Sequence, residues 1–323
     1  DTHVHIESDQ FQLPQQAKAD NFILLDINGD WGPPYVPAQK QITLLAKQKY
    51  PDQVRYASSF EAKNFNDPQW VSQVIDSLKD SFAKGAIAVK VWKNIGMELK
   101  DKDSNFVMID NPRIDTILDF IAKNNITLLS HQGEPKNCWL PLDQMTVEGD
   151  REYFRNNPQY HMYLHPEYPS YEQQIAARDH MIEKHPDLKI VSVHLASLEW
   201  NVDEIAKRLD KFPNMAVDIA ARIEHLQYAA ATDWKKIHDF LIKYQDRILY
   251  GTDMVETPEA DATIAADIHN KWLNDWKFLV SDETLTNSDK KTYKGMHLPK
   301  TVVDKIYAAN AERWIPGLAQ NKF

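Results

Sequence analysis

The sequence predicts an α/β fold in which strands and helices alternate along one domain of residues 1–323. Short apolar runs recur along the whole chain, and longer amphipathic stretches separate them. The chain of 323 residues is long for an ordinary domain, but it has the size of one closed barrel of eight strands and eight helices. We therefore expect a single (β/α)8, or TIM, barrel.

Eight apolar runs are the expected strands. They span residues 3–6, 22–28, 54–60, 86–92, 126–131, 189–195, 215–221 and 248–253. A doubly wound open sheet is the alternative, but such a sheet normally carries a glycine-rich phosphate turn after its first strand. This chain has no such turn.

Amphipathic stretches between the runs are the expected helices, and the clearest span 68–83, 112–124, 170–184, 202–211 and 233–245. Pro68 and Pro112 suit the first turn of a helix, and the Asp or Asn before each is a candidate N-cap. The connections after strands 4, 5 and 8, at about 93–111, 132–169 and 254–299, are too long for simple turns. These long loops are expected to form the walls of a pocket.

Composition excludes several classes of protein. A net charge of −10 and a pI near 5.6 argue against a nucleic-acid surface, and no apolar run approaches the ~20 residues of a membrane span. The single cysteine, Cys138, excludes an internal disulfide framework and a cysteine-based zinc site. Because the chain begins without Met at its first expected strand, we expect upstream residues to be missing, and the compartment stays open.

Histidines and one aspartate stand at the ends of several expected strands. His3 and His5 lie one residue apart, so on a strand both imidazoles point to one face and can approach one metal ion. His131, His194 and Asp253 end the fifth, sixth and eighth runs. Since the active site of a TIM barrel lies at the carboxyl ends of its strands, these residues are expected to meet at one mouth. The pattern predicts a metalloenzyme.

Five segments together resemble the amidohydrolase superfamily, in particular its amidohydrolase-related (aminocarboxymuconate-semialdehyde decarboxylase-like) branch. They are DTHVHI, LLSHQGE, VSVHLAS, LYGTDM and the closing LPKTVVDKIYAANAERW, in which Asn310, Ala311 and Arg313 take recurrent positions. The resemblance spans the whole chain. It implies that His3, His5, His131 and Asp253 are metal ligands and that His194 is a ligand or a catalytic acid–base.

The expected cofactor is a divalent ion. Imidazole nitrogen and carboxylate oxygen suit Zn²⁺ first, and also Mn²⁺ or Fe²⁺, better than Ca²⁺ or Mg²⁺. Lys90 ends the fourth strand, where binuclear members of the superfamily carry a lysine that CO₂ converts to a bridging carbamate. The decarboxylase-like branch lacks that lysine and uses one metal, so one ion is favoured over two. Lys90 can equally bind an anionic substrate or pair with a carboxylate.

Other residues near the strand ends are candidates for binding the substrate. Arg222 follows the seventh strand and can clamp a substrate carboxylate, although a salt bridge to Glu224 or Asp218 would explain it equally well. Glu134 can assist proton transfer or orient a ligand. Four tryptophans can line a pocket for a ring or a sugar, although packing alone also accounts for them, and two loop histidines are secondary candidates. These six residues are Trp31, Trp92, Trp139, Trp200, His165 and His297.

The expected function is that of a metal-dependent hydrolase acting on a small organic ester, lactone or amide through metal-activated water, with Asp253 or His194 moving the proton. The alternative is a lyase that decarboxylates an aromatic or unsaturated acid without oxidation. Both reactions need a Lewis acid and one proton carrier, so the sequence does not separate them. The substrate is expected to be small and anionic or cyclic. A homo-oligomer stays open, whereas a noncatalytic binding protein would lack ligands that are all present here.

Overall fold

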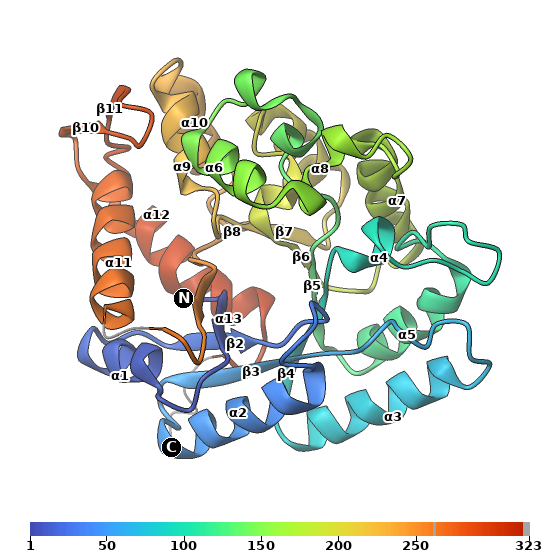
Figure 1. Cartoon of the computed structure of the whole chain (residues 1–323). Coiled ribbons are helices and arrows are strands. Elements are labelled where there is room, and N and C mark those ends of the chain that lie inside the picture. Colours follow the sequence, from blue (N-terminus) through green and yellow to red (C-terminus); the bar gives the residue numbers. More distant parts are fainter. Residues whose placement is uncertain (261–262, 319–323) are drawn as a thin grey trace.

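A computed structural model describes residues 1–260 and 263–318, and it shows a parallel β-barrel surrounded by helices (Figure 1). The strands lie side by side in chain order from β1 to β8, and β9 pairs with the other edge of β1. Their bounds are β1 Val4–Ile6, β2 Leu24–Ile27, β3 Val54–Ser59, β4 Ala86–Val91, β5 Thr127–Ser130, β6 Ile190–Ser192, β7 Met215–Asp218, β8 Ile248–Leu249 and β9 Met254–Glu256. The expected TIM-barrel fold is confirmed.

The eighth barrel strand is interrupted, which corrects the prediction of one continuous strand over 248–253. The chain leaves β8 at Leu249 and re-enters the sheet as β9, which pairs in parallel with β1. Between them, Tyr250 O accepts from Thr2 N (2.9 Å) and His3 O accepts from Asp253 N (2.8 Å), so the barrel closes. The break lies where a Cβ on Gly251 would stand 2.8 Å from the Cβ of His3.

Helices cover the outside of the barrel. The longer ones are α1 Gln12–Ala19, α2 Val36–Lys49, α3 Trp70–Ala83, α5 Pro112–Lys123, α7 Tyr171–Lys184, α8 Val202–Lys211, α9 Ile223–Ala230, α10 Trp234–Lys243 and α11 Ile264–Val280. The last helices of the described part are α12 Lys300–Asp304, a π-helical segment at Lys305–Ala309 and α13 Asn310–Trp314. Within the described residues, no helix is long and apolar enough to cross a membrane.

One predicted helix start is right and one is wrong. α5 begins at Pro112, and the side chain of Asn111 accepts from Arg113 N at 3.0 Å, as an N-cap does. α3 instead begins at Trp70, two residues after Pro68. Asp67 begins a turn before that helix. Its carbonyl oxygen accepts from Trp70 N, and its carboxylate accepts from Gln69 N.

The interior of the barrel has an apolar floor and a polar mouth. The floor is a buried cluster of strand residues that includes Leu25, Ala88, Leu129 and Val191. Trp314 of α13 belongs to the same cluster. Because side chains alternate along a strand, residues two positions further along share that inner face. Lys90 follows Ala88 and His131 follows Leu129 in this way, so both are directed toward the mouth.

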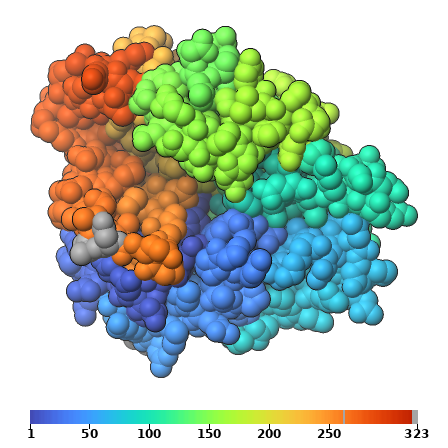
Figure 2. Space-filling view, viewed as in Figure 1, coloured from blue at the N-terminus to red at the C-terminus, as the bar shows by residue number. Residues whose placement is uncertain are grey.

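The connections over the mouth contain more regular structure than simple loops. The segment after β4 contains α4 (Asn94–Met97), and the segment after β5 contains α6 (Glu148–Asn156) and several 3₁₀ turns. The latter segment, residues 131–170, forms the green lobe at the top of Figure 2. The expected loop 254–299 is mostly α11 and a hairpin of β10 (Thr284–Thr286) and β11 (Thr292–Lys294).

The chain makes an unusual left-handed turn directly after β6. His194, Leu195, Ala196 and Ser197 have φ angles of 58, 53, 59 and 52°, and none of them is a glycine. The left-handed conformation costs roughly 1–2 kcal/mol for each such residue. Two buried side chains hold the turn: Asp218 accepts from His194 N at 2.6 Å, and the guanidinium of Arg178 donates to Ala196 O. His194 therefore stands on a strained backbone.

Because of this strain, we expect a glycine substitution in the turn to stabilise the fold, whereas glycine normally destabilises a regular element. Ala196→Gly should raise the free energy of unfolding by about 1 kcal/mol, since glycine adopts a positive φ without steric cost. Ala206→Gly in the middle of α8 is the matched control and should lower it by about 0.5–1 kcal/mol. Urea unfolding followed by circular dichroism measures both. A destabilised Ala196→Gly protein would show that the turn is not strained.

Candidate active site

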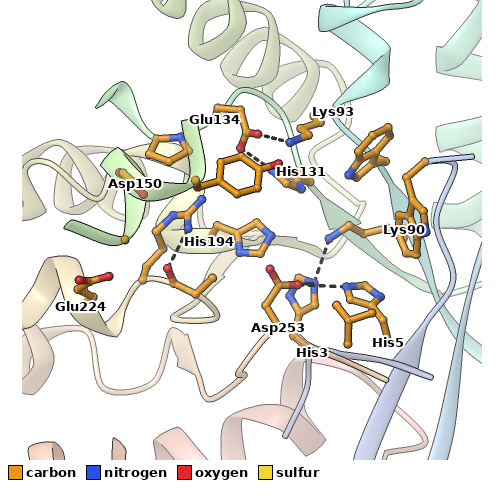
Figure 3. A pocket seen from close by; sticks show the side chains of 18 of the residues that line it. His3, His5, Lys90, Lys93, His131, Glu134, Asp150, His194, Glu224 and Asp253 are labelled. Carbon is orange, nitrogen blue, oxygen red and sulfur yellow. Dashed lines mark hydrogen bonds and ion pairs between the residues drawn. The ribbon is translucent and has the colours of Figure 1, made fainter. Parts of the chain in front are cut away.

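The strand-end residues meet around one cavity of about 570 Å³ (Figure 3). β1 supplies His5 and the residue before β1 is His3, β4 supplies Lys90, and the residues after β5, β6 and β8 supply the other three. All six predicted candidates for the metal site line the cavity, namely His3, His5, Lys90, His131, His194 and Asp253. The fold thus gathers at one mouth residues that are up to 250 positions apart in the sequence.

Three of the histidines are held in the same tautomer. In each, Nδ1 lies at hydrogen-bond distance from an oxygen that can only accept, so Nδ1 carries the proton and the lone pair stays on Nε2. The pairs are His3 with the carboxylate of Asp218 (2.8 Å), His5 with the carbonyl of Ile27 (2.7 Å) and His194 with the carbonyl of Ala220 (2.9 Å). This is the arrangement by which proteins orient imidazole ligands toward a metal.

Asp253 faces two of these lone pairs. Its Oδ1 lies 3.1 Å from His5 Nε2 and 3.3 Å from His3 Nε2. Burial alone would raise the pKa of Asp253, but the nearby His194 and His3 hold it well below its ordinary value, so the carboxyl is ionised. No helix follows Asp253, since β9 begins at the next residue, so its carboxylate does not cap a helix.

The donor set fits a divalent transition ion. The ligand atoms of His3, His5 and Asp253 lie within 4.8 Å of one another. Within the described part of the chain, the buried Nε2 of His131 has no hydrogen-bond partner, as expected of an atom reserved for a ligand. A second group of His3, His194 and Asp218 also converges, but both carboxylate oxygens of Asp218 already accept protein hydrogen bonds.

Lys90 is fully enclosed beside this group. Its Nζ lies 3.3 Å from His3 Nε2 (Figure 3), and burial lowers its pKa to about 8. Burial also lowers the pKa of His131 and of His194 well below the ordinary value. Both imidazoles are therefore neutral at neutral pH.

Glu134 has a partner that the sequence did not reveal. One of its carboxylate oxygens accepts a charge-assisted hydrogen bond from Lys93, which is also buried. The other lies 3.7 Å from His131 Nε2, too far for a hydrogen bond. Lys93 therefore adds a second cation to the cavity, close to His131.

Arg222 lines the cavity and forms no salt bridge with any residue that the structure describes. Its Nη1 donates to the carbonyl of Ala221 at 2.8 Å, and its buried Nε has no hydrogen-bond partner among those residues. Arg222 forms no ion pair with Glu224 or Asp218 within 4 Å among the described residues. The alternative prediction, a salt bridge to one of these acids, is therefore wrong. Its guanidinium remains available to an anionic ligand.

Only two of the four candidate tryptophans reach the cavity. Trp31 and Trp92 line it with ring centroids 6.1 Å apart. Trp139 instead packs on Tyr171, with ring centroids 5.4 Å apart, and Trp200 is 43% exposed. Neither of the two secondary loop histidines, His165 and His297, lines the cavity.

Several residues of the cavity were missed by sequence reasoning. They are Glu7, Lys93, Asp150, Tyr153, Phe154 and Glu224. Asp150, Tyr153 and Phe154 lie on α6, inside a connection whose length was informative but whose residues carried no recognisable motif. Asp218 was missed as a partner of His3, although an acid within the buried run MAVDIAA was an available signal.

Comparison with solved structures supports the fold. The chain is similar to 2,6-dihydroxybenzoate decarboxylase from Rhizobium, with a TM-score of 0.55 and 13% identity over 97% of this chain and 98% of that one. It is also similar to a dihydroxybenzoic acid decarboxylase from a Polaromonas species with bound manganese (TM-score 0.54, 12% identity, 97% and 95% covered).

A third similar structure is a probable 2-pyrone-4,6-dicarboxylic acid hydrolase from Acinetobacter baumannii with bound citric acid (TM-score 0.52, 12% identity, 98% of each chain covered). None of the curated proteins matches the chain. The model of the amidohydrolase family matches residues 62–316, which is most of the sequence. With its barrel and its cluster of histidines at the strand ends, this chain belongs to the amidohydrolase family.

Proposed function

We propose that the protein is a metal-dependent lyase that removes CO₂ from a small aromatic or unsaturated carboxylic acid without oxidation. The observation that carries the proposal is the guanidinium of Arg222, which forms no ion pair with a described residue, in the same cavity as the rings of Trp31 and Trp92. This combination suits a planar anion. The likeness to two decarboxylases over nearly the whole chain supports the same reaction.

We assign the metal site to His3, His5, His131 and Asp253. A single divalent ion, Zn²⁺ or Mn²⁺, suits these donors. When bound, it supplies a Lewis acid that stabilises negative charge on a substrate oxygen. Lys90 then serves as an unmodified lysine beside one ion, rather than as the carbamate of a binuclear site.

The protein's own residues supply orientation and a proton. Arg222 binds the substrate carboxylate, and the tryptophan rings pack against the planar part of the substrate. The carbon–carbon bond to the carboxylate breaks, CO₂ leaves, and the carbon that keeps the electron pair takes one proton. His194 can deliver that proton from Nε2 after taking one from solvent, because its Nδ1 is held by Ala220.

Hydrolysis of a lactone or ester is the second candidate. Its support is the likeness to the probable dicarboxylic acid hydrolase, which covers 98% of this chain. In that reaction Asp253 would accept a proton from the attacking water, and His194 would protonate the leaving oxygen. Arg222 suits a carboxylate on either kind of substrate.

The two functions are separated by products. Protein loaded with Mn²⁺ or Zn²⁺ is incubated with hydroxybenzoates, including 2,6-dihydroxybenzoate, and with 2-pyrone-4,6-dicarboxylate, and both CO₂ and ring products are measured. We expect CO₂ release from an aromatic acid and its loss with a chelator. Lactone opening without CO₂ release would favour the hydrolase and refute the lyase.

The ligand assignment predicts loss of metal with the fold kept. His3→Ala and His5→Ala should each bind far less metal than the wild type, which should hold one ion per chain, and activity should fall in parallel. The circular dichroism spectrum of His5→Ala should not change, because Nδ1 of His5 bonds only to the carbonyl of Ile27. His3→Ala also leaves the buried Oδ2 of Asp218 without its donor, so its free energy of unfolding should fall. His165→Ala, outside the cavity, is the control. A metal-replete, active His5→Ala protein would contradict the assignment.

The role of His194 predicts a separation of binding from turnover. His194→Asn should retain most of the metal but lower kcat by about 100-fold or more, because it removes the proton carrier and keeps a polar side chain of similar size. Elemental analysis and steady-state kinetics on the same preparation measure both quantities. If metal is lost together with activity, His194 is a ligand instead.

A further inference from the structure

The end of the cavity away from the histidines has a polar wall whose use the reaction above leaves open. Figure 3 shows Asp150 and Glu224 on the side opposite His5 and Lys90. Asp150 comes from α6, in the lobe of residues 131–170, and its side chain is almost completely buried. A buried carboxylate is costly unless its oxygens are hydrogen-bonded.

Two buried side chains hold this carboxylate by a single oxygen. Oδ2 of Asp150 accepts from Asn137 Nδ2 at 2.8 Å and lies 2.9 Å from His225 Nε2. Burial alone would raise the pKa of Asp150, but the hydrogen bond from His225 and the charges of His225 and Arg222 lower it. The group is therefore an ionised acceptor with a fixed orientation.

The other oxygen is free. Among the residues that the structure describes, Oδ1 of Asp150 accepts no hydrogen bond, and Asp150 lines the cavity. Arg222, which lines the same cavity, forms no ion pair with it within 4 Å. The wall thus contains a guanidinium donor and a carboxylate acceptor that line the same cavity.

We propose that Asp150 is a specificity-determining residue that accepts a hydrogen bond from a hydroxyl group on the substrate. The inference rests on the proposed function and narrows its substrate class to hydroxylated aromatic or unsaturated acids. Arg222 binds an anionic group, and Oδ1 of Asp150 selects a neighbouring donor. A ligand that places only an acceptor there leaves the carboxylate unpaired and is rejected.

The contacts of Asp150 make one substitution especially informative. Asn137 Nδ2 can only donate to the Oδ2 position, so in Asp150→Asn we expect the amide oxygen to take that position. The amide NH₂ then occupies the place of Oδ1, and the cavity presents a donor where it presented an acceptor. The buried hydrogen bonds to the Oδ2 position persist, whereas the preference for a ligand that donates at the Oδ1 position should be lost or reversed.

The experiment measures binding without requiring turnover. Benzoates carrying either a hydroxyl or a methoxy group at each ring position are titrated by calorimetry into manganese-loaded wild-type, Asp150→Asn and Asp143→Asn proteins. Asp143→Asn is the matched control, since Asp143 is an exposed acid in the same segment. In the wild type and in this control, at least one hydroxybenzoate should bind about tenfold or more tightly than its methoxy counterpart.

In Asp150→Asn that ratio should fall to about one or invert. A ratio equal to that of the wild type, in a folded variant, overturns the proposal. If the variant does not fold, the wild-type ratios decide, because the absence of any preference for a hydroxyl also overturns it. Benzoates that bind without such a preference refute this subsite alone, whereas failure of every benzoate to bind refutes the aromatic-acid function as well.

Discussion

The buried carboxylate of Asp218 connects the ends of three neighbouring parts of the barrel, β7, β1 and β6, two of which carry histidines of the site. From the end of β7 it accepts from His3 Nδ1 on β1 at 2.8 Å and from the backbone N–H of His194 after β6 at 2.6 Å. Burial alone would raise its pKa, but His3 lowers it, so it stays ionised. An uncompensated buried charge is expensive, and the hydrogen bonds from the His3 side chain and from the backbone of His194 offset that cost. The tautomer of His3 and the position of His194 thus follow from one interaction.

The same constraint explains why a strained turn persists at His194. A run of left-handed residues without glycine would relax to ordinary backbone if nothing opposed it. Here Asp218 fixes its first N–H, and the buried Arg178 fixes its third carbonyl. Strain of this kind is maintained where the surrounding structure over-determines the backbone, and such places cluster at active sites. The strain therefore supports the interpretation that the orientation of the His194 imidazole in the cavity is important for activity.

Sequence reasoning predicted the barrel and the strand-end residues that line the cavity, because both depend on local patterns. Apolar runs mark strands, and polar residues at their ends mark the mouth, so His131 and Asp253 were found without any contact information. The break in the eighth strand was not predicted, since the close approach of Gly251 to His3 that accompanies it joins residues far apart in the sequence. Trp139 was misplaced for a similar reason: a residue that follows a strand can turn away from the mouth, and its contact with Tyr171 became visible only in three dimensions.

The residues that the sequence missed show how the molecule divides its tasks. The strands hold the cluster of His3, His5 and Asp253, whose geometry the barrel hydrogen bonds fix, whereas α6 brings Asp150 from a connection that no strand constrains. A connection can change its residues without disturbing the barrel, so the wall it forms can be adapted to a new substrate while the cluster is retained. Motifs at strand ends consequently indicate the chemistry, and the identity of the substrate has to be inferred from the lobe above them. In this chain that lobe brings the fixed carboxylate of Asp150 to the cavity, and the segment after β7 brings the guanidinium of Arg222, which has no ion pair among the described residues.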